Sequence, residues 1–89
     1  MRAVITVVGK DMVGILAKVS GICSEYSANV IEVSQSILQD MFCMIMLVDL
    51  KACTVEFSEF AKTLEKSGEE LNLSVHVMHE DIFNTMHHI

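Results

Sequence analysis

The sequence predicts an α+β sandwich, in which a four-stranded antiparallel sheet carries two helices on one face. Three observations predict this fold. Two segments are apolar on both alternating faces, as central strands are, and two others place apolar residues at helical spacing. The order along the chain is strand, helix, strand, strand, helix, strand. With 89 residues, the chain has the length of one small domain.

The first strand is expected at residues 2–8, which are rich in β-branched side chains. A helix follows from Gly14, because the apolar residues after it recur on one helical face. These residues are Ile15, Leu16, Val19, Ile22, Cys23 and Tyr26. Gly21 interrupts this helix at a cost of about 1 kcal/mol relative to alanine. We therefore expect Gly21 to mark a point of close packing.

Residues 27–39 alternate apolar and polar side chains and predict a strand with one polar face. The apolar positions are Ile31, Val33 and Ile37, and the polar ones are Glu32, Ser34 and Ser36. A turn at residues 39–41 leads into residues 41–50, which are apolar on both faces and predict a second central strand. The turn lacks the Asn-Gly or Asp-Gly pair of tight hairpins, so the register is open by a residue or two.

The second helix is expected from Thr54 to a residue between Gly68 and Asn72. Its apolar face consists of Phe57, Phe60, Ala61 and Leu64. Residues 73–78 alternate again and predict the last strand. The tail at residues 80–89 predicts a short helix, because its apolar residues Ile82, Phe83, Met86 and Ile89 fall on one helical stripe. The acidic residues at its start and the histidines at its end complement the helix dipole.

This order, βαββαβ with a C-terminal helix, predicts a ferredoxin-like sandwich if the crossovers are right-handed. The first and third strands then lie side by side in the middle of the sheet, and both helices cover one face. The opposite face carries too many apolar residues to stay in contact with water. We expect either the tail helix or a second subunit to cover it.

The composition excludes several classes of function. The net charge is −6, and the six basic residues are scattered along the chain, so direct nucleic-acid binding is not expected. The three cysteines form no Cys-x-x-Cys pair, which favours a reducing compartment. No apolar stretch has the length of a signal peptide core or a membrane span. We expect a cytoplasmic protein without membrane contact.

The side chains do not predict catalysis. Cys23 and Cys43 lie at apolar positions and are expected to be buried, while Cys53 has no histidine near it in sequence to act as a base. His76 and His79 have an odd spacing that would place them on opposite faces of a strand. We therefore expect no catalytic residue, no metal site and no cofactor.

The first loop is the part that could bind a ligand. The N–H groups of Gly14, Ile15 and Leu16 would lack intrahelical partners and could hold a carboxylate at the helix N-terminus. Asp11 would then supply a carboxylate for an ammonium group, and Asn29 a second polar anchor. A zwitterionic amino acid needs this pairing. The alternative is that Asp11 only caps the helix and Gly14 only suits the turn.

The segment at residues 7–37 resembles the ACT domain, with an Asp-x-x-Gly-Ile-Leu opening, a helix, and an Asn-Val pair at the start of the second strand: VVGKDMVGILAKVSGICSEYSANVIEVSQSI. The similarity continues through the tail, HEDIFNTMHHI. The chain looks like the small single-domain ACT proteins of the UPF0237 type, which are related to the ACT repeats of a glycine-cleavage regulator. We expect one ACT domain over residues 1–89, with the helical tail at about residues 80–89.

The resemblance implies a regulatory, amino-acid-sensing module that forms homo-oligomers side by side through the first helix and the second strand. The ligand would lie between the first loop of one subunit and the second strand of the other. Carried onto this sequence, the binding residues are Asp11, Gly14, Ile15, Leu16, Asn29, Val30 and Ile31. The leading expectation is a non-enzymatic module that regulates a protein partner. The alternative is an interaction module without a ligand, which docks a partner through its apolar sheet face and tail.

Overall fold

The structure is a computed structural model that describes residues 1–10 and 14–87, apart from the side chains of residues 86 and 87. The element order confirms the predicted βαββαβ arrangement with a C-terminal helix. The elements are β1 (Arg2–Gly9), α1 (Ile15–Glu25), β2 (Asn29–Leu38), β3 (Met41–Asp49), α2 (Phe57–Glu70), β4 (Ser74–His79) and α3 (Glu80–His87).

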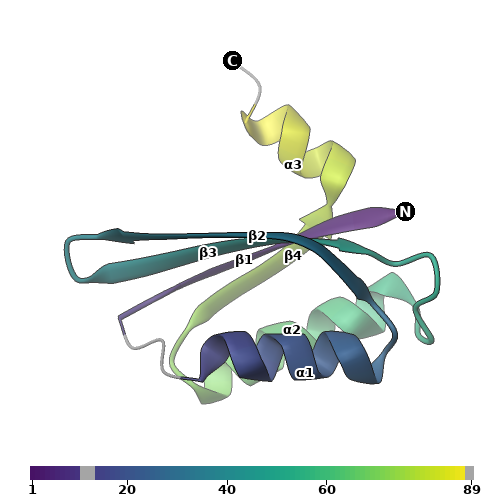
Figure 1. Cartoon of the computed structure of the whole chain (residues 1–89), viewed down its shortest axis with the longest axis horizontal. Coiled ribbons are helices and arrows are strands. Elements are labelled where there is room, and N and C mark those ends of the chain that lie inside the picture. Colours follow the sequence, from purple (N-terminus) through teal and green to yellow (C-terminus); the bar gives the residue numbers. More distant parts are fainter. Residues whose placement is uncertain (11–13, 88–89) are drawn as a thin grey trace.

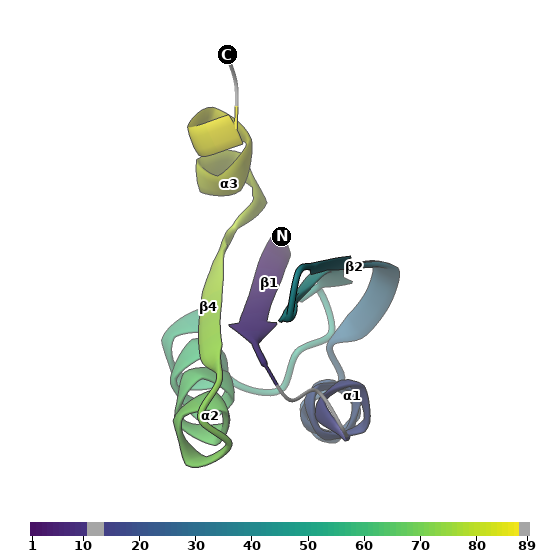
Figure 2. The same ribbon diagram turned by 90° about the vertical axis from the view of Figure 1, so that its left-hand side faces the viewer.

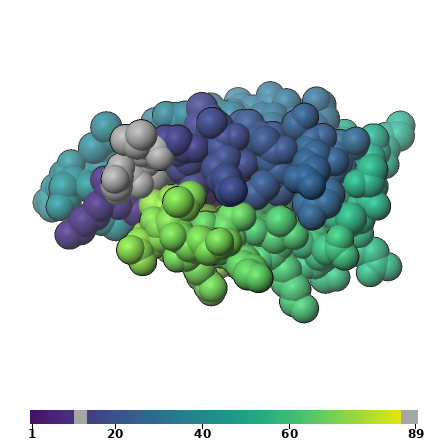
Figure 3. All heavy atoms as spheres, turned by 90° about the horizontal axis from the view of Figure 1, so that it is seen from below, coloured from purple at the N-terminus to yellow at the C-terminus, as the bar shows by residue number. Residues whose placement is uncertain are grey.

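The four strands form one antiparallel sheet in the order β2-β3-β1-β4. The predicted central strands are therefore the central strands of the structure. Helices α1 and α2 lie side by side on one face of the sheet (Figures 1 and 2). Seen from that side, the two helices cover most of the sheet, and the tip of the β2–β3 hairpin projects beyond them (Figure 3). The ferredoxin-like prediction is confirmed.

The core lies between the sheet and the two helices. In the register of the sheet, Ile5 of β1 is opposite Met46 of β3 and Val77 of β4, and these side chains face the helices. Phe60 of α2 is completely buried against this layer. Gly68 of α2 is buried against β4. A Cβ at this position would lie 2.3 Å from a methyl group of Val75, which is too close for any side chain. Glycine at this position lets the helix lie close to β4.

Alternate residues of each strand point away from the helices, and we call this side the outer face. It consists of Val4, Thr6, Val8, Glu32, Ser34, Ser36, Cys43, Ile45, Leu47, Ser74, His76 and Met78. Helix α3 leaves the end of β4 on this side and stands up from the sheet (Figures 1 and 2). Arg2 anchors its first residue, because Nε and Nη2 donate hydrogen bonds of 3.0 and 2.6 Å to the Glu80 carboxylate.

The second helix begins later than predicted. Residue Thr54 stays in the loop because its N–H donates a hydrogen bond of 2.9 Å to the carbonyl oxygen of Tyr26, at the end of α1. The helix starts at Phe57, after Glu56 as N-cap. This loop contact ties the end of α1 to the start of α2.

Two details within the first half also differ from expectation. Gly21 was expected at a close-packing point, but it is exposed on α1 and a Cβ there would meet no atom within 4 Å in the chain. The alternation of β2 is interrupted by a bulge, since Val30 pairs with Val48 and Glu32 with Leu47. Ile31 is the extra residue between them. A bulge adds one residue to one strand, which a pattern of period two does not reveal.

The two edge strands are not equivalent. On β4, the N–H of Val77 donates a hydrogen bond of 3.3 Å to the carboxylate of Glu65, which reaches it from α2. Strand β2 pairs with β3 on one side, and nine of its ten residues are exposed. An exposed edge of this length is a template for pairing with another strand.

Candidate functional site

The backbone conformation at position 14, in the first loop, explains why this residue is glycine. Gly14 is the N-cap of α1 and has φ of 78° and ψ of −3°, in the left-handed region that side chains disfavour. The structure also leaves space there, since a Cβ on Gly14 would meet no atom within 4 Å. Glycine therefore suits the left-handed backbone that begins α1.

The predicted loop residues differ in the direction of their side chains. Ile15 belongs to the hydrophobic core, so only its backbone N–H is available to a ligand. Leu16 points outward and is 41% exposed. Asp11, the predicted partner of an ammonium group, lies outside the residues that the structure describes. The described part of the predicted loop site is thus a set of backbone N–H groups beside one exposed apolar side chain.

The predicted strand residues lie at the beginning of β2. Asn29 is exposed and pairs with Asp49 of β3. Val30 packs against the core, whereas Ile31 is exposed at the bulge. Of these three residues, Asn29 offers the polar side chain, and Ile31 offers apolar surface next to it.

A single chain does not bring the first-loop residues close to the residues at the start of β2. Gly14 precedes α1 and Asn29 follows it, and the eleven residues of this helix span about 16 Å at 1.5 Å per residue. Strand β2 then runs back along α1, so the tip of the hairpin lies at the same end of the molecule as the first loop (Figure 1). Any site that uses both groups needs a second chain.

One ion pair at the loop end of the molecule has no counterpart among the predicted contacts. The ammonium group of Lys10 lies 3.8 Å from the carboxylate of Asp40, which joins the end of β1 to the turn between β2 and β3. Both side chains are exposed, so this pair contributes little stability, roughly 0–1 kcal/mol. Residues thirty positions apart give no local signal of such a contact in the sequence.

The histidines lie on opposite sides of β4, as their spacing predicts. The ring of His79 stacks on Phe57 of α2, with centroids 4.2 Å apart. His76 lies on the outer face, where its Nε2 is 3.3 Å from the hydroxyl of Ser74. Across the described part of the chain, no group of three or more potential metal ligands converges.

The cysteines are free thiols in different environments. Cys23 is buried on α1, whereas Cys43 and Cys53 are half-buried. Burial raises the pKa of the Cys23 thiol from its ordinary value of 9.0 to about 11, and the neighbouring Cys53 thiol adds to this shift. Cys23 is therefore a protonated core residue at neutral pH, as its place on the apolar stripe predicts.

This raised pKa predicts a loss of stability in alkali. The folded state holds the Cys23 proton more tightly than the unfolded state does, so the contribution is intact below pH 9 and is lost as the pH rises towards 11. Urea unfolding of wild type and Cys23→Ala, measured from pH 8 to 11, should show their free energies of unfolding converging. A difference that stays constant with pH would contradict the assignment.

None of the helices that the structure describes is long and apolar enough to cross a membrane. The chain is a small α+β domain with one open sheet edge and, among its described residues, no group of three or more potential metal ligands. This arrangement defines the class of ferredoxin-like α+β sandwich domains.

Comparison with known proteins gives the family. The model of the ACT domain matches residues 2–78. A UPF0237 protein of Methanocaldococcus jannaschii is 48% identical over 88 residues, which cover 99% of this chain and 98% of that protein. This chain belongs to the ACT domain family, and its relatives along the full length are UPF0237 proteins.

Solved structures agree with this assignment. An ACT domain protein from Streptococcus pneumoniae is 36% identical, with a TM-score of 0.81 over 93% of both chains. A structure assigned to a glycine cleavage system transcriptional repressor has a TM-score of 0.71 at 23% identity, over 85% of this chain and 43% of that chain. At this lower identity, the second likeness concerns the fold alone. The predicted family is therefore confirmed.

Proposed function

We propose that this chain is a non-catalytic, cytoplasmic regulatory module that binds a small amino acid between two copies of itself. The observation that carries the proposal is the distance, within one chain, between the predicted binding residues of the first loop and those at the start of β2. About 16 Å of helix lies between Gly14 and Asn29 within one chain. A ligand that needs both groups must take them from different chains.

The exposed edge of β2 provides the means of association. Antiparallel pairing of two β2 strands places the start of one beside the tip of the other. Since the tip lies at the same end as the first loop, this pairing brings Asn29 of one copy towards Gly14 of its partner (Figure 1). Association through β2 also sets the two α1 helices beside each other, where the exposed Gly21 permits close approach.

The class of ligand follows from the chemical groups of the first loop of one copy and of the start of β2 in the other. The N–H groups of Gly14, Ile15 and Leu16 suit a carboxylate, because the helix dipole adds positive potential there. Asp11 supplies the charge for an ammonium group, and Asn29 of the partner copy adds a hydrogen bond. The side chains of Leu16 and Ile31 provide apolar walls, while Val30 holds the start of β2 against the core. A small, uncharged side chain fits these surroundings.

Calorimetric titration with the twenty amino acids tests this proposal. We expect at least one to bind, and Asn29→Ala to weaken its binding by roughly 10- to 100-fold, the effect of losing a hydrogen bond to a charged group. Asp11→Ala should weaken it as well. Asn84→Ala, which removes an exposed amide on α3, is the matched control and should bind as wild type does.

The competing function is that of an interaction module without a ligand. Apolar residues exposed at the site, Leu16 and Ile31, favour it, because such surface also suits a protein partner. If no amino acid gives binding heat with the wild-type protein, the result rejects amino-acid sensing and supports the interaction module.

A further inference from the structure

The three thiols of the chain lie in two separate places. Cys43 belongs to β3 and points to the outer face of the sheet. Cys23 lies in the core on the opposite side, and Cys53 packs against the same core. The part of β3 from Cys43 to Asp49 is about 20 Å long, and Cys53 follows beyond that end. Cys23 and Cys53 are therefore the two thiols that one chain can bring together.

A hydrogen bond holds the backbone beside Cys53 against the end of α1. The N–H of Thr54, the next residue, donates a bond of 2.9 Å to the carbonyl oxygen of Tyr26. Tyr26 follows Cys23 by three residues, so their Cα atoms are about 5 Å apart in helical geometry. The contact places Cys53 beside the last turn of α1, which carries Cys23.

A second set of backbone contacts leads to the same place through the sheet. The carbonyl oxygen of Cys23 accepts a hydrogen bond of 2.8 Å from the N–H of Ala28. The N–H of Cys53 donates one of 3.1 Å to the carbonyl oxygen of Leu50. Ala28 and Leu50 directly adjoin the first residue pair between β2 and β3. Both cysteines thus lie at one junction, where the end of α1, the start of β2 and the end of β3 meet.

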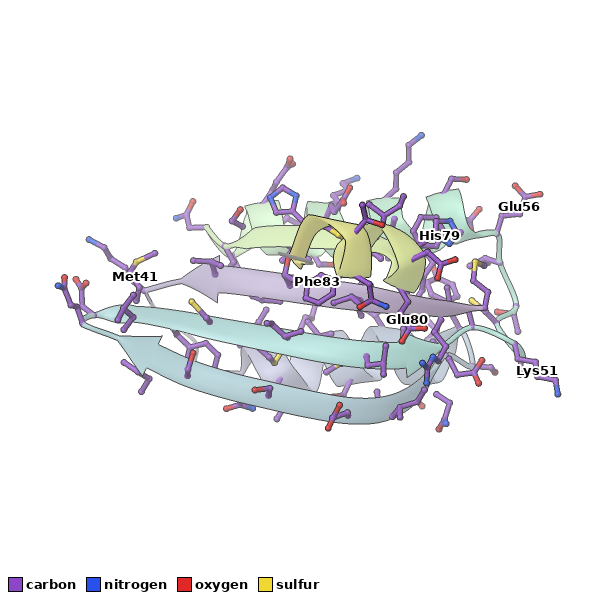
Figure 4. All side chains as sticks on the ribbon, turned by 90° about the horizontal axis from the view of Figure 1, so that it is seen from above. Met41, Lys51, Glu56, His79, Glu80 and Phe83 are labelled. Carbon is purple, nitrogen blue, oxygen red and sulfur yellow. The ribbon has the colours of Figure 1, made fainter. Side chains whose placement is uncertain are left out.

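The two thiols of this junction differ in exposure. Cys23 is only 1% exposed, so a reagent in solution does not reach it directly. Cys53 is half-buried in the loop between the exposed residues Lys51 and Glu56, at the end of the sheet away from Met41 (Figure 4). Burial raises the pKa of the Cys23 thiol, and the charge of an ionised Cys53 adds to the rise. This second effect acts only between near neighbours.

We propose that Cys23 and Cys53 form a reversible disulfide by exchange with a low-molecular-weight disulfide such as oxidised glutathione. The Cys53 thiolate attacks one sulfur of the reagent, whose S–S bond breaks, and one glutathione leaves as a thiolate that takes up a proton. The Cys23 thiolate then attacks Sγ of Cys53 and displaces the second glutathione thiolate. Two cysteine thiols are oxidised, and one molecule of oxidised glutathione is reduced to two thiols.

The bond locks the end of α1 to the loop before α2. It closes a ring over residues 23–53, which contains both β2 and β3. Such a ring restricts the unfolded chain and stabilises the folded one. In a reducing compartment the bond forms only while an oxidising disulfide is abundant, so this crosslink is reversible and not a permanent staple.

Equilibration in a glutathione redox buffer tests the pair. Because the Cys23 thiol is protonated at neutral pH, its attack is slow, and the equilibrium is measured instead of the rate. After free thiols are trapped with iodoacetamide, peptide mapping by mass spectrometry should show residues 23 and 53 joined. Cys43→Ser is the matched control and should form the same crosslink. A lasting glutathione adduct on Cys53, or a crosslink to Cys43 in its place, would overturn the proposal.

The same equilibrium in concentrated urea shows whether the fold brings the two thiols together. In one glutathione buffer, we expect the ratio of crosslinked to reduced chain to be at least about tenfold higher in the folded protein. By linkage, the crosslinked chain should then unfold at a higher urea concentration than the reduced chain. A ratio no higher in the folded protein than in urea would refute the proposal. Both measurements are made without any amino acid, so they are independent of ligand binding.

Discussion

Replacing Phe60 with alanine is expected to lower the free energy of unfolding by about 3–5 kcal/mol, the largest effect of any single truncation of this core. Phe60 is completely buried beneath the sheet. Its ring also meets that of Tyr26 edge to face, with centroids 6.4 Å apart. The substitution therefore removes packing between α2 and the end of α1 as well as between α2 and the sheet.

Phe57→Ala is the matched control for this prediction, since Phe57 is half-buried at the start of the same helix and stacks on His79. It should cost less than half as much. Urea unfolding followed by circular dichroism, at one fixed protein concentration, gives both values. Equal losses in the two variants would mean that Phe60 does not hold the helical layer to the sheet.

A proline in β2 should abolish both pairing through the sheet edge and amino-acid binding. In an antiparallel strand, the N–H groups of neighbouring residues point alternately to one side and the other. Of Ser34 and Gln35, one therefore faces β3 and the other faces away from the sheet. Proline at the position facing β3 removes a bond of the sheet and should destabilise the fold.

Proline at the other position should leave the chain folded but block a second strand from pairing. We expect this variant to show half the mass of the wild-type assembly and no binding heat with the amino acid that the wild type binds. Ser34→Ala and Gln35→Ala keep their N–H groups and should behave as wild type. A folded proline variant with the wild-type mass would exclude pairing through β2.

The sequence predicted the sheet and its helices because their signals are local and repeated. Apolar residues on both faces identify β1 and β3 as central, and the helical spacing of Val19, Ile22 and Cys23 identifies the buried side of α1. The start of α2 was missed because its cause is not local. Thr54 is a good N-cap residue by type, but its hydrogen bonds go to Tyr26, 28 residues away in the chain.

The candidate site was predictable only in part, for the same reason. Gly14 at the start of a helix is visible in the sequence, and so is Asn29 at the start of a strand. The burial of Ile15 was predicted, but the exposure of Leu16 on the same helix and of Ile31 at the bulge depends on how the elements pack, which sequence periodicity does not encode. The contact between Lys10 and Asp40 depends on where the hairpin ends in space.

The carboxylate of Glu65 occupies a hydrogen-bonding position on the edge of β4 that a strand of another chain would otherwise use. Two sheets joined at β2 would present β4 at both outer ends, and there the Val77 N–H is already engaged by Glu65. In such a pair, this contact leaves one N–H fewer on each β4 edge for a further strand. Glu65→Ala would free that amide and is the change most apt to turn a finite assembly into a fibrillar one.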